Sequence, residues 1–289
     1  MIEIQNLTLL KKDKQLLFPL SLSIQKGEIV CLAGRNGAGK TTFLRCLLGL
    51  EQDYKGKISI FDSMPKSEIL KKIGVMIDGL SLYSYLTGKE NLDIIRRYYQ
   101  LPFEAISHTL ELVGLQEAAN QPTKQYSAGM KQRLAIGMAF IHKPELIILD
   151  EPLNALDPEA IIEIRQLIKR LNANFGTTFL ITSHSLEEIS KIFSRLLIFK
   201  NGKMLINAQR EILDSYYQMQ TYSLKNDIIF LLDLIKKKDI FYKKEEEKIE
   251  VLGTMEQLES LKKATNGAFS WESPKKSSVE EIYLFANFQ

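Results

Sequence analysis

The sequence contains only two cysteines among its 289 residues, Cys31 and Cys46. Both lie in apolar stretches, so we expect buried, reduced thiols, and nothing indicates a disulfide framework or a zinc site. The three histidines, His108, His142 and His184, are too scattered along the chain to indicate a metal cluster. Composition therefore argues against a disulfide-rich secreted domain and against a metal centre built on cysteine or histidine.

Charge of one sign and long hydrophobic runs are also lacking. The 38 basic and 35 acidic residues leave a net charge of +3, which supplies no electrostatic reason to expect a nucleic-acid partner. Apolar runs such as Leu146–Leu149 end at an aspartate, far short of the roughly 20 residues that span a bilayer. The N-terminus has no basic head followed by an apolar run, as a signal peptide would. We therefore expect a cytoplasmic protein that reaches a membrane only through another chain.

Short apolar runs alternate with segments of helical periodicity. Such runs, where they are continuous, indicate strands buried on both faces, and the alternation predicts an α/β sheet. The expected strands are Ile29–Ala33, Leu146–Leu149 and Thr178–Thr182, and the helices that follow them are Thr41–Leu50, Ala160–Leu171 and Leu186–Phe193.

The remaining segments predict two further parts of the chain. Residues from about 86 to 140 read mostly as helices. We expect a helical subdomain at about 79–135, within a first domain, 1–206, that ends in a hairpin at Asn201-Gly202. Residues 207–289 predict a small accessory α+β domain with the order βαββαβ, its last strand at 268–271.

A glycine-rich loop follows the first buried strand. Residues 34–41 read Gly-Arg-Asn-Gly-Ala-Gly-Lys-Thr and match the pattern G-x-x-x-x-G-K-[ST]. Glycines let backbone N–H groups approach phosphates, and the helix that opens at Thr41 adds its N-terminal donors. Lys40 is expected to reach the β- and γ-phosphates, and the Thr41 hydroxyl to hold Mg²⁺. The predicted phosphate-binding residues are Asn36, Gly37, Ala38, Gly39, Lys40, Thr41 and Thr42.

Two adjacent acids, Asp150 and Glu151, end the second buried strand. An aspartate there can hold Mg²⁺, and a neighbouring glutamate can orient and deprotonate an attacking water. Taken alone, the pair reads equally well as a polar turn leading to Pro152. It does not stand alone, because Ser127-Ala128-Gly129 lies upstream and Ala155-Leu156-Asp157 and Thr182-Ser183-His184 lie downstream.

In the order and spacing of these motifs the chain resembles the ABC ATPases over about residues 1–205. The resemblance implies the ABC-type P-loop nucleotide-binding fold, a mixed sheet core with a helical subdomain, with ATP and Mg²⁺ as its ligands. It implies that Ser127, Ala128 and Gly129 form the signature loop that meets ATP bound to a second subunit, and that Asp157 belongs to a loop coupling the two sites. It further implies that Glu151 is the catalytic base and His184 the switch residue.

The signature loop is altered at Ala128 and Met130, where the family usually has glycine and glutamine, and two further features depart from the family pattern. The adenine-stacking aromatic usual near residues 10–13 is absent, since this segment reads Leu-Lys-Lys-Asp, and we expect only modest discrimination between ATP and GTP. Asp78 stands where the family has a glutamine that contacts Mg²⁺ and relays to the membrane subunit. A carboxylate there, a glutamate in those cases, is typical of bacitracin- and lantibiotic-type exporters, and it can still ligate Mg²⁺.

The chain's end resembles type-2 ABC exporter ATPases in its Ser277–Tyr283 segment. The expected function is thus the ATP-hydrolysing subunit of an exporter of peptide or lipid-like molecules. Its expected partners are transmembrane permease subunits and a second ATPase subunit, identical or related, with no nucleic acid. A non-transport ABC ATPase acting on ribosomes or DNA is the alternative, although one such domain per chain and the short stretch between Lys40 and Ser127 count against it.

Overall fold

The computed structural model describes residues 1–62, 64–77, 79, 82–223, 228–238, 240–244, 248–265, 269, 272 and 275–288. Its centre is a six-stranded sheet of order β5-β6-β7-β3-β8-β9, parallel except for β9. These strands are β3 (Ile29–Ala33), β5 (Ile73–Met76), β6 (Leu146–Leu149), β7 (Thr178–Ser183), β8 (Arg195–Lys200) and β9 (Lys203–Gln209). The α/β sheet and its three predicted buried strands are confirmed.

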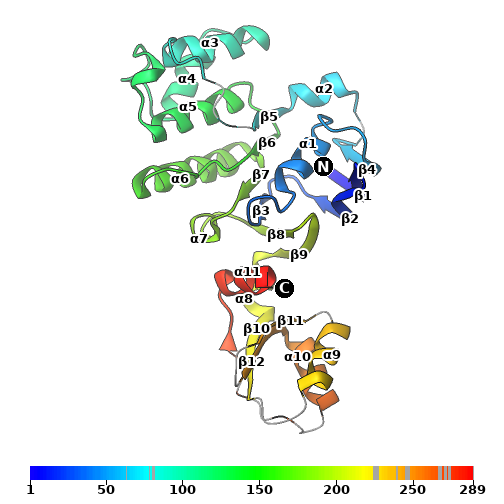
Figure 1. Cartoon of the computed structure of the whole chain (residues 1–289). Coiled ribbons are helices and arrows are strands. Elements are labelled where there is room, and N and C mark those ends of the chain that lie inside the picture. Colours follow the sequence, from blue (N-terminus) through cyan, green and yellow to red (C-terminus); the bar gives the residue numbers. More distant parts are fainter. Residues whose placement is uncertain are drawn as a thin grey trace.

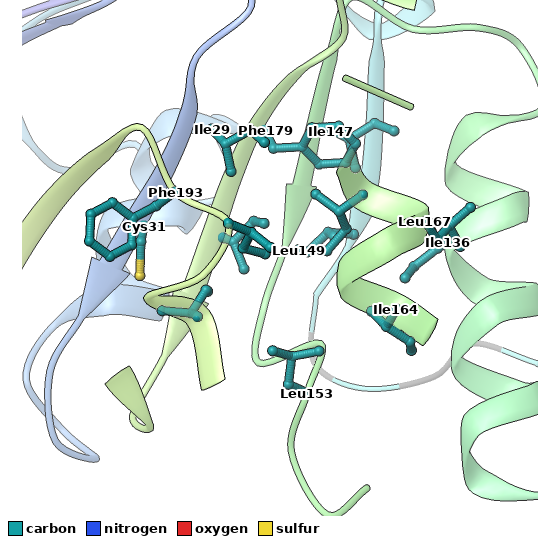
Figure 2. Packing of buried hydrophobic residues seen from close by; sticks show 14 of the residues in the cluster. Ile29, Cys31, Ile136, Ile147, Leu149, Leu153, Ile164, Leu167, Phe179 and Phe193 are labelled. Atoms are coloured by element: carbon teal, nitrogen blue, oxygen red, sulfur yellow. The ribbon is translucent and has the colours of Figure 1, made fainter. Parts of the chain in front are cut away.

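The central strands are buried on both faces, which explains why they lack polar alternation. Ile147, Leu149 and Phe179 point to the same core as Ile164 and Leu167 of α6 (Pro158–Phe175), as Figure 2 shows. The alternate residues of the same strands enter a second core on the opposite face, which contains Val30, Leu32, Leu146, Ile148 and Leu180. A run of four to six apolar residues therefore serves two cores at once.

The second core is closed by α1 (Lys40–Leu47) and by an antiparallel sheet of order β2-β1-β4. Its strands are β1 (Ile2–Lys11), β2 (Lys14–Ile24) and β4 (Lys55–Ile60). The first two strands pair with each other along almost their whole length. No sequence prediction covered β4, α2 (Lys66–Lys71) or the edge strand β5.

Helices α3 (Gly88–Tyr98), α4 (Glu104–Leu112) and α5 (Ala128–Phe140) gather at one end of the molecule (Figure 1). Thr87 and Glu90 form a reciprocal capping box that begins α3, with the Thr87 hydroxyl accepting from the Glu90 N–H at 3.1 Å. The mostly helical character predicted for this region is confirmed. A one-turn helix, α7 (Leu186–Ile189), follows β7 and is shorter than predicted.

The C-terminal elements form a separate four-stranded sheet of order β11-β12-β10-β13, seen in the lower part of Figure 1. They run β10 (Tyr217–Ser223), α9 (Ile228–Lys237), β11 (Phe241–Lys244), β12 (Lys248–Thr254), α10 (Met255–Thr265) and β13 (Lys275–Lys276), followed by α11 (Val279–Phe288). The βαββαβ order is found in these elements; the strand predicted at 268–271 lies, except for residue 269, outside the described residues and stays a prediction. α8 (Arg210–Tyr216) and α11 pack on the core of the six-stranded sheet through Leu213 and Ile282. The division at residue 207 stays a prediction.

Both cysteines are buried and unpaired, as expected. Burial raises the pKa of the Cys46 thiol to about 11 and also raises the pKa of Cys31. None of the helices in the described ranges combines the length and the apolar composition that a bilayer-spanning helix needs.

Candidate active site

The glycine-rich loop joins β3 to α1 and is shaped by close backbone approaches. A Cβ atom at Gly34 would lie 2.5 Å from the Phe199 carbonyl oxygen, so no larger residue fits there. Gly37 and Gly39 have φ angles of 79° and 104°, in the left-handed region that favours glycine. Asn36 and Gly37 are exposed at the tip of the loop, Ala38 is buried beneath it, and Thr42 is half-buried in the first turn of α1.

The Lys40 side chain lies between the phosphate loop and Glu151. Its side chain is 6% exposed, and its ammonium donates to the Gly34 carbonyl at 2.6 Å. The same nitrogen lies 3.1 Å from Glu151 Oε1. A buried cation at a helix N-terminus makes this end of the sheet suited to an anion, because the first N–H groups of a helix have no partner within it.

Asp150 and Glu151 follow β6 and face the phosphate loop. The Thr41 hydroxyl donates to Asp150 Oδ2 at 3.0 Å, so a loop residue and a strand-end carboxylate lie in contact. Thr182 of β7 donates its hydroxyl to Asp150 Oδ1 at 2.5 Å and accepts from the Glu151 N–H at 2.8 Å. Glu151 has a φ of 51°, an unusual backbone conformation that this hydrogen bond holds.

Thr182 is not among the predicted site residues. Its hydroxyl, fully buried, is the group that ties the two acids together. The sequence signal for Thr182 is a hydroxyl residue at the end of an apolar strand. This signal identifies a site residue only if that strand is known to lie beside the strand that ends in Asp150 and Glu151.

His184 lies directly after β7 and contacts Glu151 twice. Its Nδ1 lies 2.8 Å from Glu151 Oε2, and its backbone N–H donates to the same oxygen at 3.2 Å. The imidazole remains 41% exposed. The structure therefore brings five predicted residues into one connected cluster: Lys40, Thr41, Asp150, Glu151 and His184.

The Ser127 loop and Asp157 form a second group. Ser127 begins α5 and its hydroxyl accepts from the N–H three residues on, at 3.2 Å. Asp157 begins α6 in the same manner, accepting from the Ala160 N–H at 2.8 Å. A Cβ atom at Gly129 would lie 2.7 Å from the Ala160 Cβ, so the two helix starts touch. Ser127 and Ala128 are exposed, and within the described part of the chain no hydrogen bond or ion pair joins them to the phosphate loop.

Two further predicted features have different outcomes. Asp78, predicted to contact Mg²⁺, lies outside the described residues. At the position of the missing adenine-stacking ring, Lys11 pairs with Glu51 at 2.7 Å, and this hydrogen bond raises the pKa of Lys11 and lowers that of Glu51.

The donor set at the centre of the cluster fits Mg²⁺. The Thr41 hydroxyl and the Asp150 carboxylate are hard oxygen ligands, and Mg²⁺ is usually held by few protein oxygens together with waters and substrate phosphates. Within the described ranges there is no group of three or more histidine, cysteine, aspartate or glutamate residues of the kind that encloses a metal ion by itself.

Comparison with known proteins gives consistent matches. The ABC transporter family profile matches residues 17–154. An uncharacterized ABC transporter ATP-binding protein of Bacillus subtilis is 39% identical over 214 residues, 73% of this chain and 70% of the relative. The bacitracin transport ATP-binding protein of Enterococcus faecalis is 39% identical over 71% of this chain and 68% of its own length. The lantibiotic transport ATP-binding protein of Streptococcus pyogenes is 36% identical over 72% of this chain and 91% of its own length.

Solved structures resemble the same part of the chain. A dimeric bacterial ABC transporter cassette superposes with a TM-score of 0.64 at 27% identity, covering 72% of this chain and 98% of the cassette. A second structure, a dimeric post-hydrolysis cassette bound to ADP and Pi, gives 0.63 at 26% identity over the same shares. Together with the phosphate loop, the paired acids and the histidine beside them, these matches show that the chain belongs to the ATP-binding, ATP-hydrolysing subunits of ABC transporters.

Proposed function

We propose that the chain is the motor subunit of an exporter that removes amphipathic peptide or lipid-like antibiotics from the cell membrane. The observation that carries this proposal is the similarity to ATP-binding proteins named for bacitracin and lantibiotic transport, at 36–43% identity. A relative named for linearmycin resistance, 35% identical over 71% of this chain, supports the broader amphipathic class.

In this proposal the phosphate loop holds the triphosphate of ATP, and Lys40 neutralises its charge. Thr41 and Asp150 hold Mg²⁺, which would offset the charge that develops on the phosphates. Glu151 orients and deprotonates the attacking water, and His184, already in contact with the Glu151 carboxylate, holds that carboxylate and contacts the terminal phosphate. These roles extend the observed geometry by assigning it to a bound nucleotide.

Ser127 and its loop lie on the exposed start of α5, and we assign them to the ATP bound by a second ATPase subunit. A hydroxyl and the free N–H groups at the start of a helix are suited to a phosphate. The dimeric state of the two related cassettes supports a pairing of two ATPase subunits. Asp157, whose helix start touches the Ser127 loop through Ala160, is then placed to sense both sites.

The permease would dock in a groove between β5 and α3. This groove, about 570 Å³ in volume, is lined largely by apolar side chains, including the exposed Val75, Tyr83 and Tyr98. The Asp150 N–H donates at 2.8 Å to the carbonyl of Met76, which lines the groove. A backbone hydrogen bond therefore links the groove directly to Asp150. A membrane subunit bound there would lie at the cytoplasmic face, and a change at the nucleotide site would be transmitted to it through this hydrogen bond.

The experiment is affinity purification from native membranes in mild detergent, comparing wild type, Glu151→Gln and the control Glu117→Gln, which alters an exposed acid on the helical subdomain. We expect a polytopic membrane protein to co-purify with all three, and more of it with Glu151→Gln in the presence of ATP. Recovery of ribosomes or DNA with no membrane protein would refute the transport function and favour the alternative.

The cargo needs its own test. A strain lacking the chain is complemented with wild type, Glu151→Gln or Glu117→Gln, and its growth is measured against bacitracin and a lantibiotic. We expect wild type and Glu117→Gln to restore resistance and Glu151→Gln to fail. Equal sensitivity of all strains to both compounds would rule out this antibiotic class.

The groove is tested by Tyr98→Ser, with Ile212→Ser of α8 as a control of similar polarity change away from the groove. Loss of the membrane partner in the first variant alone, with nucleotide binding retained, is the expected result. Retention of the partner by Tyr98→Ser combined with Val75→Ser would place the docking surface elsewhere.

A further inference from the structure

The last helix of the chain, α11, packs against the segment that carries His184. Val279, Ile282 and Ala286 lie on one face of α11, at the i, i+3, i+7 spacing of a core-facing helix, and all are buried. They share a core with Leu186 and Ile189 of α7, the helix that begins two residues after His184. Figure 1 shows α11 lying between the six-stranded sheet and the C-terminal sheet.

Tyr283 makes the direct contact between α11 and the histidine. Its ring packs on the edge of the shared core, and its hydroxyl donates to the His184 carbonyl oxygen at 3.5 Å, the long limit of a hydrogen bond. The direction of α11 is set by a reciprocal cap at its start. The Ser278 hydroxyl accepts from the Glu281 N–H at 3.1 Å, and the Glu281 carboxylate accepts from the Ser278 N–H at 2.7 Å.

The His184 segment depends on such outside contacts. α7 has only four residues, too few for a helix that is stable by itself, since nucleation costs more than one turn returns. Arg165 of α6 donates to the Glu188 carbonyl at 3.1 Å and holds the far end of α7. α11 supports the near end, next to the histidine whose ring lies 2.8 Å from Glu151.

We propose that Tyr283 is a positioning residue for ATP hydrolysis: through the His184 carbonyl and the packing of α11, it holds the imidazole at its contact with Glu151. The inference rests on the proposed function in that Glu151 and His184 act on the attacking water. The C-terminal segment is thereby assigned a place in setting the hydrolysis rate of the nucleotide site, in addition to forming its own sheet.

The experiment uses the full-length protein with Tyr283→Phe, which removes only the hydroxyl, and Tyr283→Ala, which also removes the ring. The control is Leu284→Ala, on the same helix but 52% exposed. We expect kcat for ATP to fall about twofold in Tyr283→Phe, the low end of the effect of one lost hydrogen bond because this bond is long and exposed, and further in Tyr283→Ala. KM for ATP and the thermal midpoint stay at wild-type values in Tyr283→Phe, which separates positioning from loss of structure.

A second measurement does not depend on catalysis. Hydrogen–deuterium exchange of the amides of residues 185–190 is expected to rise about fivefold in Tyr283→Ala and to stay unchanged in Leu284→Ala. Wild-type kcat in both Tyr283 variants, or unchanged exchange in Tyr283→Ala, would overturn the proposal. Failure of the export function alone would leave these exchange and hydrolysis results intact, so the two outcomes are distinguishable.

Discussion

Thr182→Val tests whether one buried hydroxyl organises the acidic pair. Valine has nearly the same shape, so the substitution removes two hydrogen bonds without opening a cavity. Asp150 Oδ1 loses the hydroxyl donor that lies 2.5 Å away in the wild type. The Glu151 N–H loses the hydroxyl acceptor that lies 2.8 Å away. Both acids are only half-buried, so water replaces part of what is lost.

The magnitude follows from these contacts. A buried polar group left without a partner costs about 1–3 kcal/mol, and the partial exposure of the acids places the sum for two groups at about 2–3 kcal/mol. For a chain of this size that loss lowers the thermal midpoint by about 3–5 °C. Thr182 also orients the carboxylate assigned to Mg²⁺, and loss of such an outer partner weakens metal binding by about 10- to 100-fold.

Two assays check this reasoning, with Thr182→Ser as the matched control because serine keeps the hydroxyl. Differential scanning calorimetry measures the midpoint, and ATP hydrolysis over a magnesium titration measures the concentration at half-maximal rate. We expect both quantities to change in Thr182→Val and to change little in Thr182→Ser. A valine variant with wild-type midpoint and wild-type magnesium dependence would show that the hydroxyl is not what holds Asp150 and Glu151.

Three other predictions concern packing, pH and the nucleotide base. Gly74→Ala would place a Cβ atom 2.0 Å from the Ala139 carbonyl oxygen; because backbone must move, calorimetry should record a loss above about 2 kcal/mol, and unchanged stability would contradict the close approach. Glu145 lies 2.8 Å from Lys72 and 3.2 Å from Lys26, and its hydrogen bond to Lys72 lowers its pKa below the ordinary value of 4.5. This partly exposed carboxylate therefore stabilises the fold by under about 1 kcal/mol above pH 4.5, and the contribution disappears as pH falls through the lowered pKa, so denaturation of Glu145→Gln and wild type should converge in acid. Because the β1–β2 turn offers no aromatic ring to the base, kcat/KM for GTP should lie within about tenfold of that for ATP, whereas strict dependence on ATP would show that another group reads the base.

Much of the nucleotide-binding fold could be predicted from short stretches of the sequence. A strand buried on both faces needs a continuous apolar run, and Ile29–Ala33 and Leu146–Leu149 are found with the predicted bounds. The phosphate loop is equally local, because its conformation depends on glycines whose φ angles and close contacts no other residue tolerates. The start of α5 is also a local feature, because the Ser127 side chain caps the helix by accepting from a backbone N–H three residues on.

Elements without a local signal were missed. Strand β4 is mostly polar and exposed, and the edge strand β5 is only four residues long and contains Gly74; both are strands because a neighbour supplies their hydrogen bonds. The overlong prediction for α7 has the related cause that apolar residues after Ile189 continue to face the core without continuing the helix.

The sequence by itself determined the phosphate loop, the buried strands and the acids at the end of β6, because each depends on neighbours within a few positions. Only the tertiary structure decided that Thr182 joins those acids and that Tyr283, 99 positions from His184, lies against the histidine segment. These contacts depend on the order of strands in the sheet and on where the last helix packs. Both result from burying apolar faces of segments far apart in the chain, and such burial is non-directional, so residue spacing alone carries no record of it.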